Sequence, residues 1–421
     1  MMTTPKTEFY EVAVRAGFYG VDRSGLTGKK DNVRKFWEDM SIKLWLRPLL
    51  AAQVAAHRPV RVVDLGCGSG EGLELLTHIP VESAERSEHE FLAAADDLEY
   101  VGLDLSPGMI EQGARNYAGL SNVRFVQADL GHGFPLAQEP PFHLYFSSYG
   151  SLSHVSADAL RRLVTDIVRH ADDGALLVFD LLGRYSPEWP AYWTADNRRM
   201  LPYNMAYLLP PEERTPERIE WFTNTFWTAA ELRETCAAVA AEAGRALTFE
   251  VLADRSIFVG RHMDTGLFNG CPQSLRHQVN RLLDHGYRGQ LDGLRVDLES
   301  LSLPAAACPA PAARLAAYAG QWNTVIRHLD ALMNRRDDEV RFLIESSPPE
   351  RADDLKMLAW LCRNGSRFPV ADFWASVVGP QVAVVLRNLE MGLPDAVGCG
   401  HALFGVVRIG GAADRGTPPR L

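Results

Sequence analysis

The segment that decides the fold is Val62-Val63-Asp64-Leu65-Gly66-Cys67-Gly68-Ser69-Gly70. Its apolar start predicts a buried strand, and its three glycines at alternate positions predict a tight turn into a helix. Because glycines permit positive φ and leave the backbone open to a ligand, this turn is typical of a loop that holds a nucleotide. Asp64 indicates which kind of nucleotide. A carboxylate favours a positively charged ligand, whereas a pyrophosphate is held by amide donors at a helix N-terminus.

The register of the glycines excludes two common phosphate-binding patterns. The dinucleotide pattern GxGxxG requires its third glycine at a position where this chain has Glu71 or Leu73. The phosphate loop GxxxxGK[ST] is also absent, since Gly28-Lys29-Lys30 lacks both the earlier glycine and the hydroxyl residue. The form that remains, DxGxGxG, resembles motif I of the class I S-adenosylmethionine-dependent methyltransferases.

Further segments resemble that family in the same order, over roughly residues 60 to 185. Residues 100–106, 123–130, 142–149 and 174–180 look like its second to fifth strands. The resemblance implies S-adenosylmethionine as cofactor, with Asp104 at the ribose hydroxyls, Met109 against the adenine ring and Asp129 at the adenine amino group. The cofactor-binding residues expected in full are Asp64, Gly66, Gly68, Gly70, Asp104, Leu105, Met109, Asp129, Leu130 and Ser147.

One departure from the family concerns spacing. The family usually places its ribose-binding acid about twenty residues beyond the glycine loop, a spacing close to that of dinucleotide sites. Here the acidic stretch 81–99 separates Gly70 from Asp104. We interpret this stretch as a solvated surface insertion.

The alternation of strands and helices predicts an α/β fold. The resemblance specifies a Rossmann-like, doubly wound sheet of seven strands whose last strand is antiparallel. Thr228 and Glu231 predict a capped helix start, after which residues 247–252 and 256–260 are candidates for the last two strands. Residues 401–409 make an equally good final strand. We prefer the earlier pair because it follows the helix without interruption; with the later strand, the intervening residues would form a large insertion.

Three regions are expected. Residues 1–58 form a helical cap, which in the family closes over the cofactor. Residues 59–264 form the S-adenosylmethionine-binding methyltransferase domain, including an aromatic lid at 185–227. Residues 265–421 form a mostly helical C-terminal domain with a disordered tail. This last region carries no recognised motif, and its expected role is homodimer formation or further enclosure of the acceptor site.

Methyl transfer by in-line displacement depends on alignment and on the protonation state of the nucleophile, and it requires no metal. Residues 147–154 should face the methyl group, so His154 is the candidate general base and Tyr149 a second catalytic candidate. Aromatic faces suit flat, apolar or cationic acceptors. The substrate-binding candidates are therefore Tyr19, Trp37, Trp189, Trp193 and Tyr203. Packing in a hydrophobic core is the alternative for each of them.

The composition limits the kinds of partner that this protein is expected to bind. Among 421 residues the net charge is −10, which gives no long-range attraction for nucleic-acid phosphates or anionic lipid. No apolar run approaches the length of a membrane span, and the start of the chain lacks the apolar core of a signal peptide. The six cysteines form no CxxC pair, as expected of reduced thiols. We expect a cytoplasmic enzyme that methylates oxygen, nitrogen or carbon of a small molecule and binds neither nucleic acid nor membrane.

Two other functions stay open. One is an NAD(P)-dependent Rossmann oxidoreductase, which the glycine register and the order of the acidic residues disfavour. The other is a non-catalytic methyltransferase-fold protein that acts as a binding partner or regulator, which the intact loop disfavours.

Overall fold

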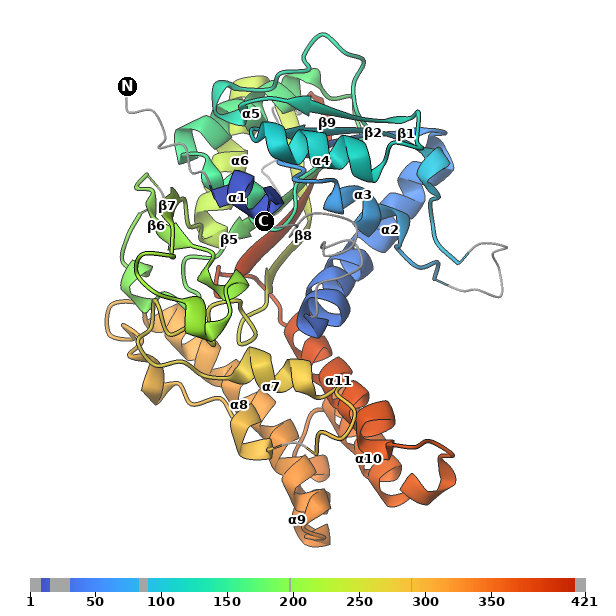
Figure 1. Ribbon diagram of the computed structural model, residues 1–421, viewed down its shortest axis with the longest axis vertical. Coiled ribbons are helices and arrows are strands. Elements are labelled where there is room, and N and C mark those ends of the chain that lie inside the picture. The colour runs from blue at the N-terminus through green and yellow to red at the C-terminus, as the bar shows by residue number, and fades with distance from the viewer. Residues whose placement is uncertain (1–8, 16–30, 83–89, 197, 289, 413–421) are drawn as a thin grey trace.

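The computed structural model describes residues 9–15, 31–82, 90–196, 198–288 and 290–412. Its centre is a seven-stranded sheet with the strand order β3-β2-β1-β4-β5-β9-β8 (Figure 1). The strands are β1 (Val60–Leu65), β2 (Leu98–Asp104), β3 (Val123–Gln127), β4 (Leu144–Phe146), β5 (Leu176–Leu182), β8 (Arg245–Arg255) and β9 (Ala402–Ala412). The first five strands are parallel, and β9 runs antiparallel to both of its neighbours. The predicted fold class is confirmed.

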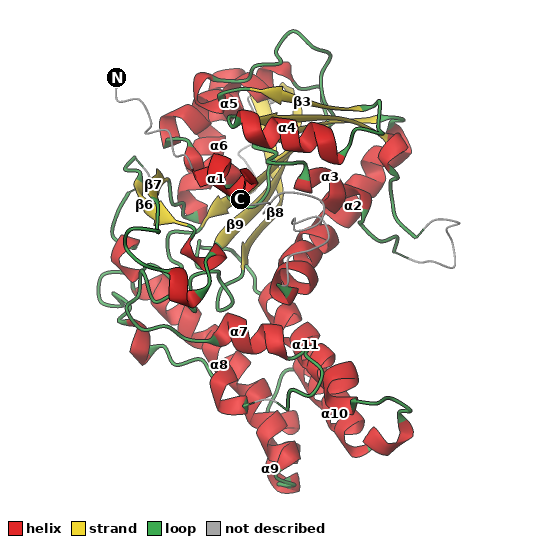
Figure 2. Cartoon of the chain, in the orientation of Figure 1, coloured by secondary structure: helices red, strands yellow, loops and turns green. Residues whose placement is uncertain are grey.

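Helices cover both faces of this sheet (Figure 2). On one face α2 (Met40–Ala56) and α3 (Glu71–Thr77) pack on strand residues that include Val62. On the other face α5 (Ala157–His170) and α6 (Ala229–Ala243) pack on residues that include Val63. Because neighbouring side chains of a strand point to opposite faces and both faces are covered, β1 is apolar at four of its six positions.

Two helices begin at capping residues, and the start at Thr228 is the one that the sequence predicted. Helix α4 (Pro107–Asn116) begins after Ser106, whose Oγ accepts a hydrogen bond from the amide of Met109. Helix α6 begins after Thr228, and Glu231 completes the capping box. These caps satisfy amide groups that the first turn of a helix leaves without partners.

The final strand differs from the one that the sequence favoured. Residues 402–412 form β9 and pair with β8, whereas residues 256–260 lie outside the sheet. The amides of Ser256 and Ile257 each donate to the carboxylate of Glu390 at 2.7 Å, so they are not available to a neighbouring strand. Our preference for the earlier pair was therefore wrong, and residues 256–401 are an insertion between β8 and β9.

The insertion is mostly helical and projects beyond one end of the sheet (Figure 1). Its helices are α7 (Leu275–Arg281), α8 (Pro309–Met333), α9 (Asp337–Glu345), α10 (Pro349–Arg363) and α11 (Gly379–Met391). It shares a hydrophobic core with the N-terminal turn η1 (Val33–Asp39), where the rings of Trp37 and Trp322 lie 5.8 Å apart. The N-terminal segment is therefore packed against the insertion as well as the sheet.

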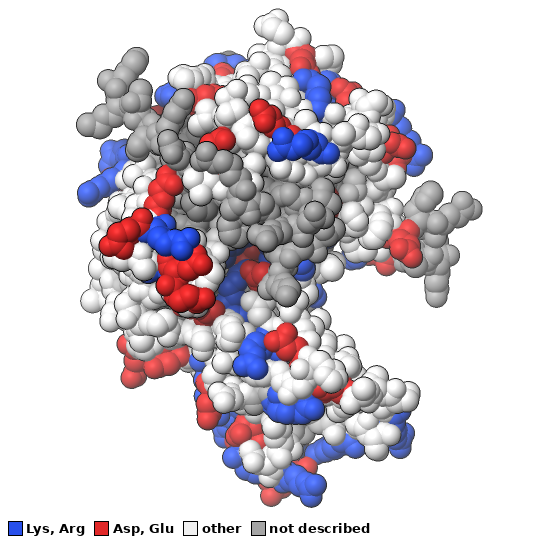
Figure 3. Space-filling model, viewed as in Figure 1, with Lys and Arg blue, Asp and Glu red and all other residues white. Residues whose placement is uncertain are grey.

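Two further features bear on partners. Within the described residues, no helix combines the length and the apolar character needed to span a membrane. On the face shown in Figure 3, acidic and basic side chains intermingle over the helical insertion. Over the part of this face that the described residues form, no extended basic area of the kind that binds nucleic-acid phosphates is visible.

The shared core predicts a large effect of Trp37→Ala. The side chain is fully buried, and its indole N–H donates to Glu390 at 2.8 Å. Its removal should lower the free energy of unfolding by about 3–5 kcal/mol, measured by urea denaturation. The matched control is Trp360→Ala, because that side chain is 53% exposed; its effect should stay within about 0.5 kcal/mol. Equal effects of the two changes would contradict the shared core.

Candidate functional site

The glycine loop, residues 64–70, lies at the carboxyl end of β1 and leads into α3. Gly66, Gly68 and Gly70 have φ values of 80°, 53° and 97°, in the left-handed region that favours glycine. A Cβ at Gly68 would meet no heavy atom of the described residues within 4 Å. The backbone at Gly68 is therefore open to an approaching ligand, as the sequence predicted for this loop.

Asp64 lies beneath the loop and is 1% exposed. Its Oδ2 accepts a hydrogen bond from the Tyr100 hydroxyl at 2.6 Å, while its Oδ1 has no hydrogen-bond partner in the described part of the chain. Burial raises the pKa of Asp64 to about 7, although the Tyr100 hydrogen bond opposes the shift. A positively charged group beside Oδ1 would be stabilised by this carboxylate.

The next strand end, that of β2, joins the same site. Asp104 accepts hydrogen bonds from the amides of Gly68 and Ser106, both at 2.9 Å, which fixes its carboxylate against the glycine loop. The side chain of Leu105, directly after it, is 53% exposed. A carboxylate beside an exposed apolar side chain matches a ribose and a flat base.

Of the other predicted cofactor-binding residues, one is partly exposed and the rest are buried. Asp129 follows β3, its side chain is 46% exposed, and it accepts a bond from the amide of Gly131. The Ser147 hydroxyl is buried and has no hydrogen-bond partner among the residues described. Leu130 and Met109 are buried, and Met109 packs against Ala13 of α1 (Phe9–Arg15). Met109 therefore lies under a helix and not on an open surface.

Helix α1 crosses the start of α4. The Glu11 carboxylate accepts hydrogen bonds from the Ser106 hydroxyl at 2.7 Å and from the Gly108 amide at 3.3 Å. These contacts hold the N-terminal helix beside the end of β2, where the predicted ribose site lies.

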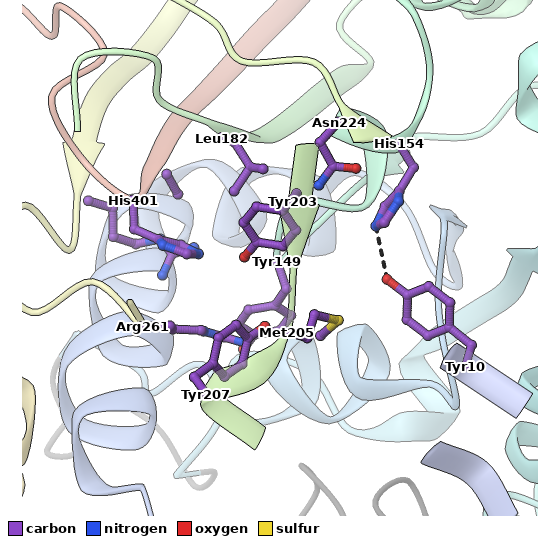
Figure 4. A pocket seen from close by; sticks show the side chains of 13 residues that line it. Tyr10, Tyr149, His154, Leu182, Tyr203, Met205, Tyr207, Asn224, Arg261 and His401 are labelled. Atoms are coloured by element: carbon purple, nitrogen blue, oxygen red, sulfur yellow. Dashed lines mark hydrogen bonds between the residues drawn. The ribbon is translucent and has the colours of Figure 1, made fainter. Parts of the chain in front are cut away.

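A pocket lies beside the glycine loop, at the carboxyl ends of β4 and β5 (Figure 4). It encloses about 400 Å³, including its open mouth, and we call it the tyrosine pocket. Gly150 lines it, and the next residue, Ser151, donates from its hydroxyl to the Gly66 carbonyl at 2.8 Å. The lining residues are Tyr10, Tyr149, Gly150, His154, Leu182, Tyr203, Met205, Tyr207, Asn224, Arg255, Arg261, His401 and Ala402.

Tyr149, a predicted catalytic residue, lines this pocket in a strained conformation. Its φ is 56°, its amide donates to Asp180 at 2.6 Å, and its hydroxyl donates to Asp39 at 2.5 Å. Burial and the neighbouring Asp39 raise the pKa of the Tyr149 phenol well above its ordinary value. This hydroxyl is suited to donating a hydrogen bond and unsuited to removing a proton.

His154, the predicted base, also lines the pocket. Its Nε2 lies 2.9 Å from the Tyr10 hydroxyl, and its ring stacks on Phe222 with centroids 5.3 Å apart. Burial lowers the pKa of His154 to about 4. The imidazole is therefore neutral near pH 7 and is a weak base.

The predicted aromatic residues do not all reach the pocket. Tyr203 lines it, and Tyr19 lies outside the described residues. Trp37, Trp189 and Trp193 are buried in hydrophobic cores, and their indole N–H groups donate to Glu390, Gly183 and Ser186 respectively. The prediction that these three tryptophans contact the substrate was therefore wrong. Their rings pack in hydrophobic cores, and their indole N–H groups already donate hydrogen bonds to other residues of the chain.

Sequence reasoning missed the cations of the pocket. Arg255 donates to both oxygens of Asp180, at 2.9 and 2.7 Å, and Arg261 donates to Glu38 at 3.1 Å. His401 lies 2.7 Å from a Glu188 oxygen. Arg255 is the last residue of β8, directly after Asp254, and an arginine there gives no signal of a pocket in the sequence. The other two are brought to the site by contacts distant in sequence.

Comparisons with known proteins add a family model and relatives. Residues 87–174 match a family model described as a methyltransferase domain. The chain is 37% identical over 99 residues to the Trans-aconitate 2-methyltransferase of Methylobacterium nodulans, and the match covers 24% of this chain and 30% of that protein. The chain thus spans less than a third of the length of this curated relative.

The solved structures that match this chain have low sequence identity to it. An S-adenosylmethionine-dependent methyltransferase from Clostridium acetobutylicum is 13% identical, with a TM-score of 0.33 over 52% of this chain and 83% of that chain. CalS10, an amino pentose methyltransferase from Micromonospora echinaspora, is 17% identical, with a TM-score of 0.31 over 60% of this chain and 94% of that chain.

The surroundings of His154 predict an unusual titration. As the pH falls, its imidazole should stay neutral until about pH 4, because burial disfavours the cation. Side-chain nitrogen shifts measured by NMR would follow the titration, and the signal is assigned by its loss in His154→Gln. A midpoint near the ordinary histidine value of about 6.5 would show that the ring is solvated.

Proposed function

Because this chain carries a class I S-adenosylmethionine-dependent methyltransferase domain, we propose that it transfers a methyl group from S-adenosylmethionine to a small molecule bound in the tyrosine pocket. The observation that carries the proposal is the link between Gly150 and Ser151. One of these neighbours lines the pocket and the other bonds the glycine loop. A methyl donor at the glycine loop and a methyl acceptor in the tyrosine pocket would therefore lie next to each other, on either side of this single backbone segment.

The glycine loop fits the proposed methyl donor in three respects. Its backbone is open at Gly68, the buried Asp64 Oδ1 lacks a hydrogen-bond partner among the described residues, and Leu105 is exposed beside Asp104. Asp64 would hold the positively charged methionyl end, Asp104 the ribose, and Leu105 and Asp129 the adenine. When bound, S-adenosylmethionine supplies an electrophilic methyl group on a positively charged sulfur.

The surroundings of the pocket support a small acceptor. Its walls come from the loop after β4, the end of β5, the hairpin of β6 (Leu201–Asn204) and β7 (Trp221–Asn224), and both ends of the insertion. A pocket walled by so many elements suits a small molecule and not a folded polymer. The names of two relatives, a trans-aconitate methyltransferase and an amino pentose methyltransferase, agree with this proposal.

A direct test compares ligands and then asks for turnover. Thermal-shift measurements should show stabilisation by S-adenosylhomocysteine and none by NAD. A panel of small acceptors is then screened for release of S-adenosylhomocysteine. Stabilisation by NAD alone would favour an oxidoreductase, and cofactor binding without turnover across a broad panel would favour a non-catalytic role.

We predict that Asp104→Ala weakens S-adenosylhomocysteine binding at least tenfold, about 1.4 kcal/mol, in isothermal titration calorimetry. The substitution removes the carboxylate expected at the ribose hydroxyls and also frees the Gly68 amide. Asp338→Ala is the matched control, since that side chain is fully exposed on α9. Unchanged affinity in Asp104→Ala would refute this assignment of the ribose site.

We also predict that binding of S-adenosylhomocysteine depends on pH through Asp64. With a pKa of about 7, the carboxylate is about one-tenth ionised at pH 6 and about nine-tenths ionised at pH 8. Because the ionised form attracts the ligand's ammonium group, affinity should rise about tenfold over this range. In Asp64→Asn the affinity should be lower and the rise absent. An equal rise in the variant would assign the pH dependence to another group.

A further inference from the structure

A second concavity adjoins the tyrosine pocket and differs from it in chemistry. It lies between α1 and the segment 205–220, and it encloses about 670 Å³ including its open side. We call it the apolar groove. Its lining includes Val12, Met205, Leu208, Leu209 and Ile219, with Arg218 and Glu220 as its charged members.

Met205 joins the two spaces, because it lines both the tyrosine pocket and the apolar groove. Figure 4 places Met205 between Tyr207 on one side and Tyr10 on the other. A ligand with a polar head and an apolar chain fits this arrangement, since each part would meet a surface of its own kind. The flexible thioether of Met205 suits this position between the two spaces, because it can adapt to a ligand whose head and chain differ in shape.

The charged groups that line the tyrosine pocket are guanidiniums. Arg255 and Arg261 line it, beside the imidazole of His401, and among the described residues no aspartate or glutamate does. Arg255 is 1% exposed, and its Nε and Nη1 have no hydrogen-bond partner in the described structure. Each of these N–H groups can donate a hydrogen bond to an oxygen of a carboxylate.

Three titratable groups of the pocket are unsuited to act as a base. His154 is a weak base, because burial lowers its pKa to about 4. Burial raises the pKa of Tyr149 and of Tyr203 well above the ordinary value, so neither phenol is ionised near neutral pH. An alcohol or an ammonium group must lose a proton before methylation, whereas a carboxylic acid is already ionised at pH 7.

We propose, on the basis of the function proposed above, that the acceptor is a carboxylic acid with an apolar chain. Its carboxylate binds beside Arg255 and Arg261 in the tyrosine pocket, its chain lies in the apolar groove, and it leaves as a methyl ester. One carboxylate oxygen forms a bond to the methyl carbon as the bond from that carbon to sulfur breaks. The electron pair stays on sulfur, giving neutral S-adenosylhomocysteine, and no proton is released.

The test separates the head from the chain with three probes. Calorimetry on the protein saturated with S-adenosylhomocysteine compares decanoate, propionate and 1-decanol. Decanoate should bind at least tenfold more tightly than either of the others. Affinity should rise with each methylene from butanoate to decanoate. With S-adenosylmethionine instead, decanoate should yield methyl decanoate, detected by mass spectrometry, together with one equivalent of S-adenosylhomocysteine.

Two variants separate the two surfaces. Leu209→Trp fills the apolar groove and should weaken decanoate binding at least tenfold while propionate binding is unchanged. Arg261→Gln should abolish the preference for decanoate over 1-decanol, with folding checked by thermal denaturation. Met333→Trp, at a side chain 51% exposed on α8, is the matched control for an added indole and should change neither affinity.

The outcomes are distinguishable. If S-adenosylhomocysteine does not bind, the proposed function fails. If it binds but decanoate binds no better than propionate, the apolar groove is not part of the acceptor site. If 1-decanol binds as well as decanoate, the cations do not select a carboxylate. Either of the last two results overturns this inference and leaves the methyltransferase assignment standing.

Discussion

The arrangement of the site depends on one buried carboxylate, that of Glu38. Its side chain is fully buried; it accepts hydrogen bonds from Arg276 at 2.8 Å and Arg261 at 3.1 Å, and Arg255 lies 3.7 Å away. Burial alone would raise the pKa of Glu38, but the three guanidiniums outweigh it and hold the pKa well below its ordinary value. Removing one member of such a buried network typically costs about 3–5 kcal/mol. Glu38, a residue of η1, thus connects η1 to the end of β8 and to the insertion.

The insertion acts on the site through its two ends, where it leaves and rejoins the sheet. Arg255, the last residue of β8, precedes the first end, and His401 closes the second end, where its amide donates to the Ser256 carbonyl at 3.2 Å. Asp254 holds the second end by accepting bonds from the amides of residues 397, 398 and 399. Because the two ends are bonded to each other and to β8, the cations that line the tyrosine pocket are fixed by backbone hydrogen bonds, although 145 residues separate Asp254 from the last of these amides.

Features set by neighbouring residues were predictable from the sequence, and features set by distant contacts were not. The glycine loop and the caps at Ser106 and Thr228 depend on backbone geometry over a few residues, so their patterns were readable. Whether residues 256–260 join the sheet depends on Glu390, 134 residues further along the chain. An apolar run in the sequence does not indicate that contact. The tryptophans failed as site predictions for a related reason. A large aromatic side chain has the same appearance in a sequence whether it faces a pocket or a core.

The buried ion pairs beside the pocket raise the question of why the fold retains them. Buried ion pairs are often no more stabilising than apolar residues of similar volume, so stability alone does not explain the three arginines around Glu38 and their acids. Arg255 is paired with Asp180 on one side, yet its Nε and Nη1 have no hydrogen-bond partner in the described chain. Each such buried donor costs about 1–3 kcal/mol. Asp180 holds the guanidinium in place at the pocket wall, and the donor groups without hydrogen-bond partners stay buried there. A ligand with oxygen acceptors would relieve that cost, so part of its binding free energy is already prepared by the folded protein.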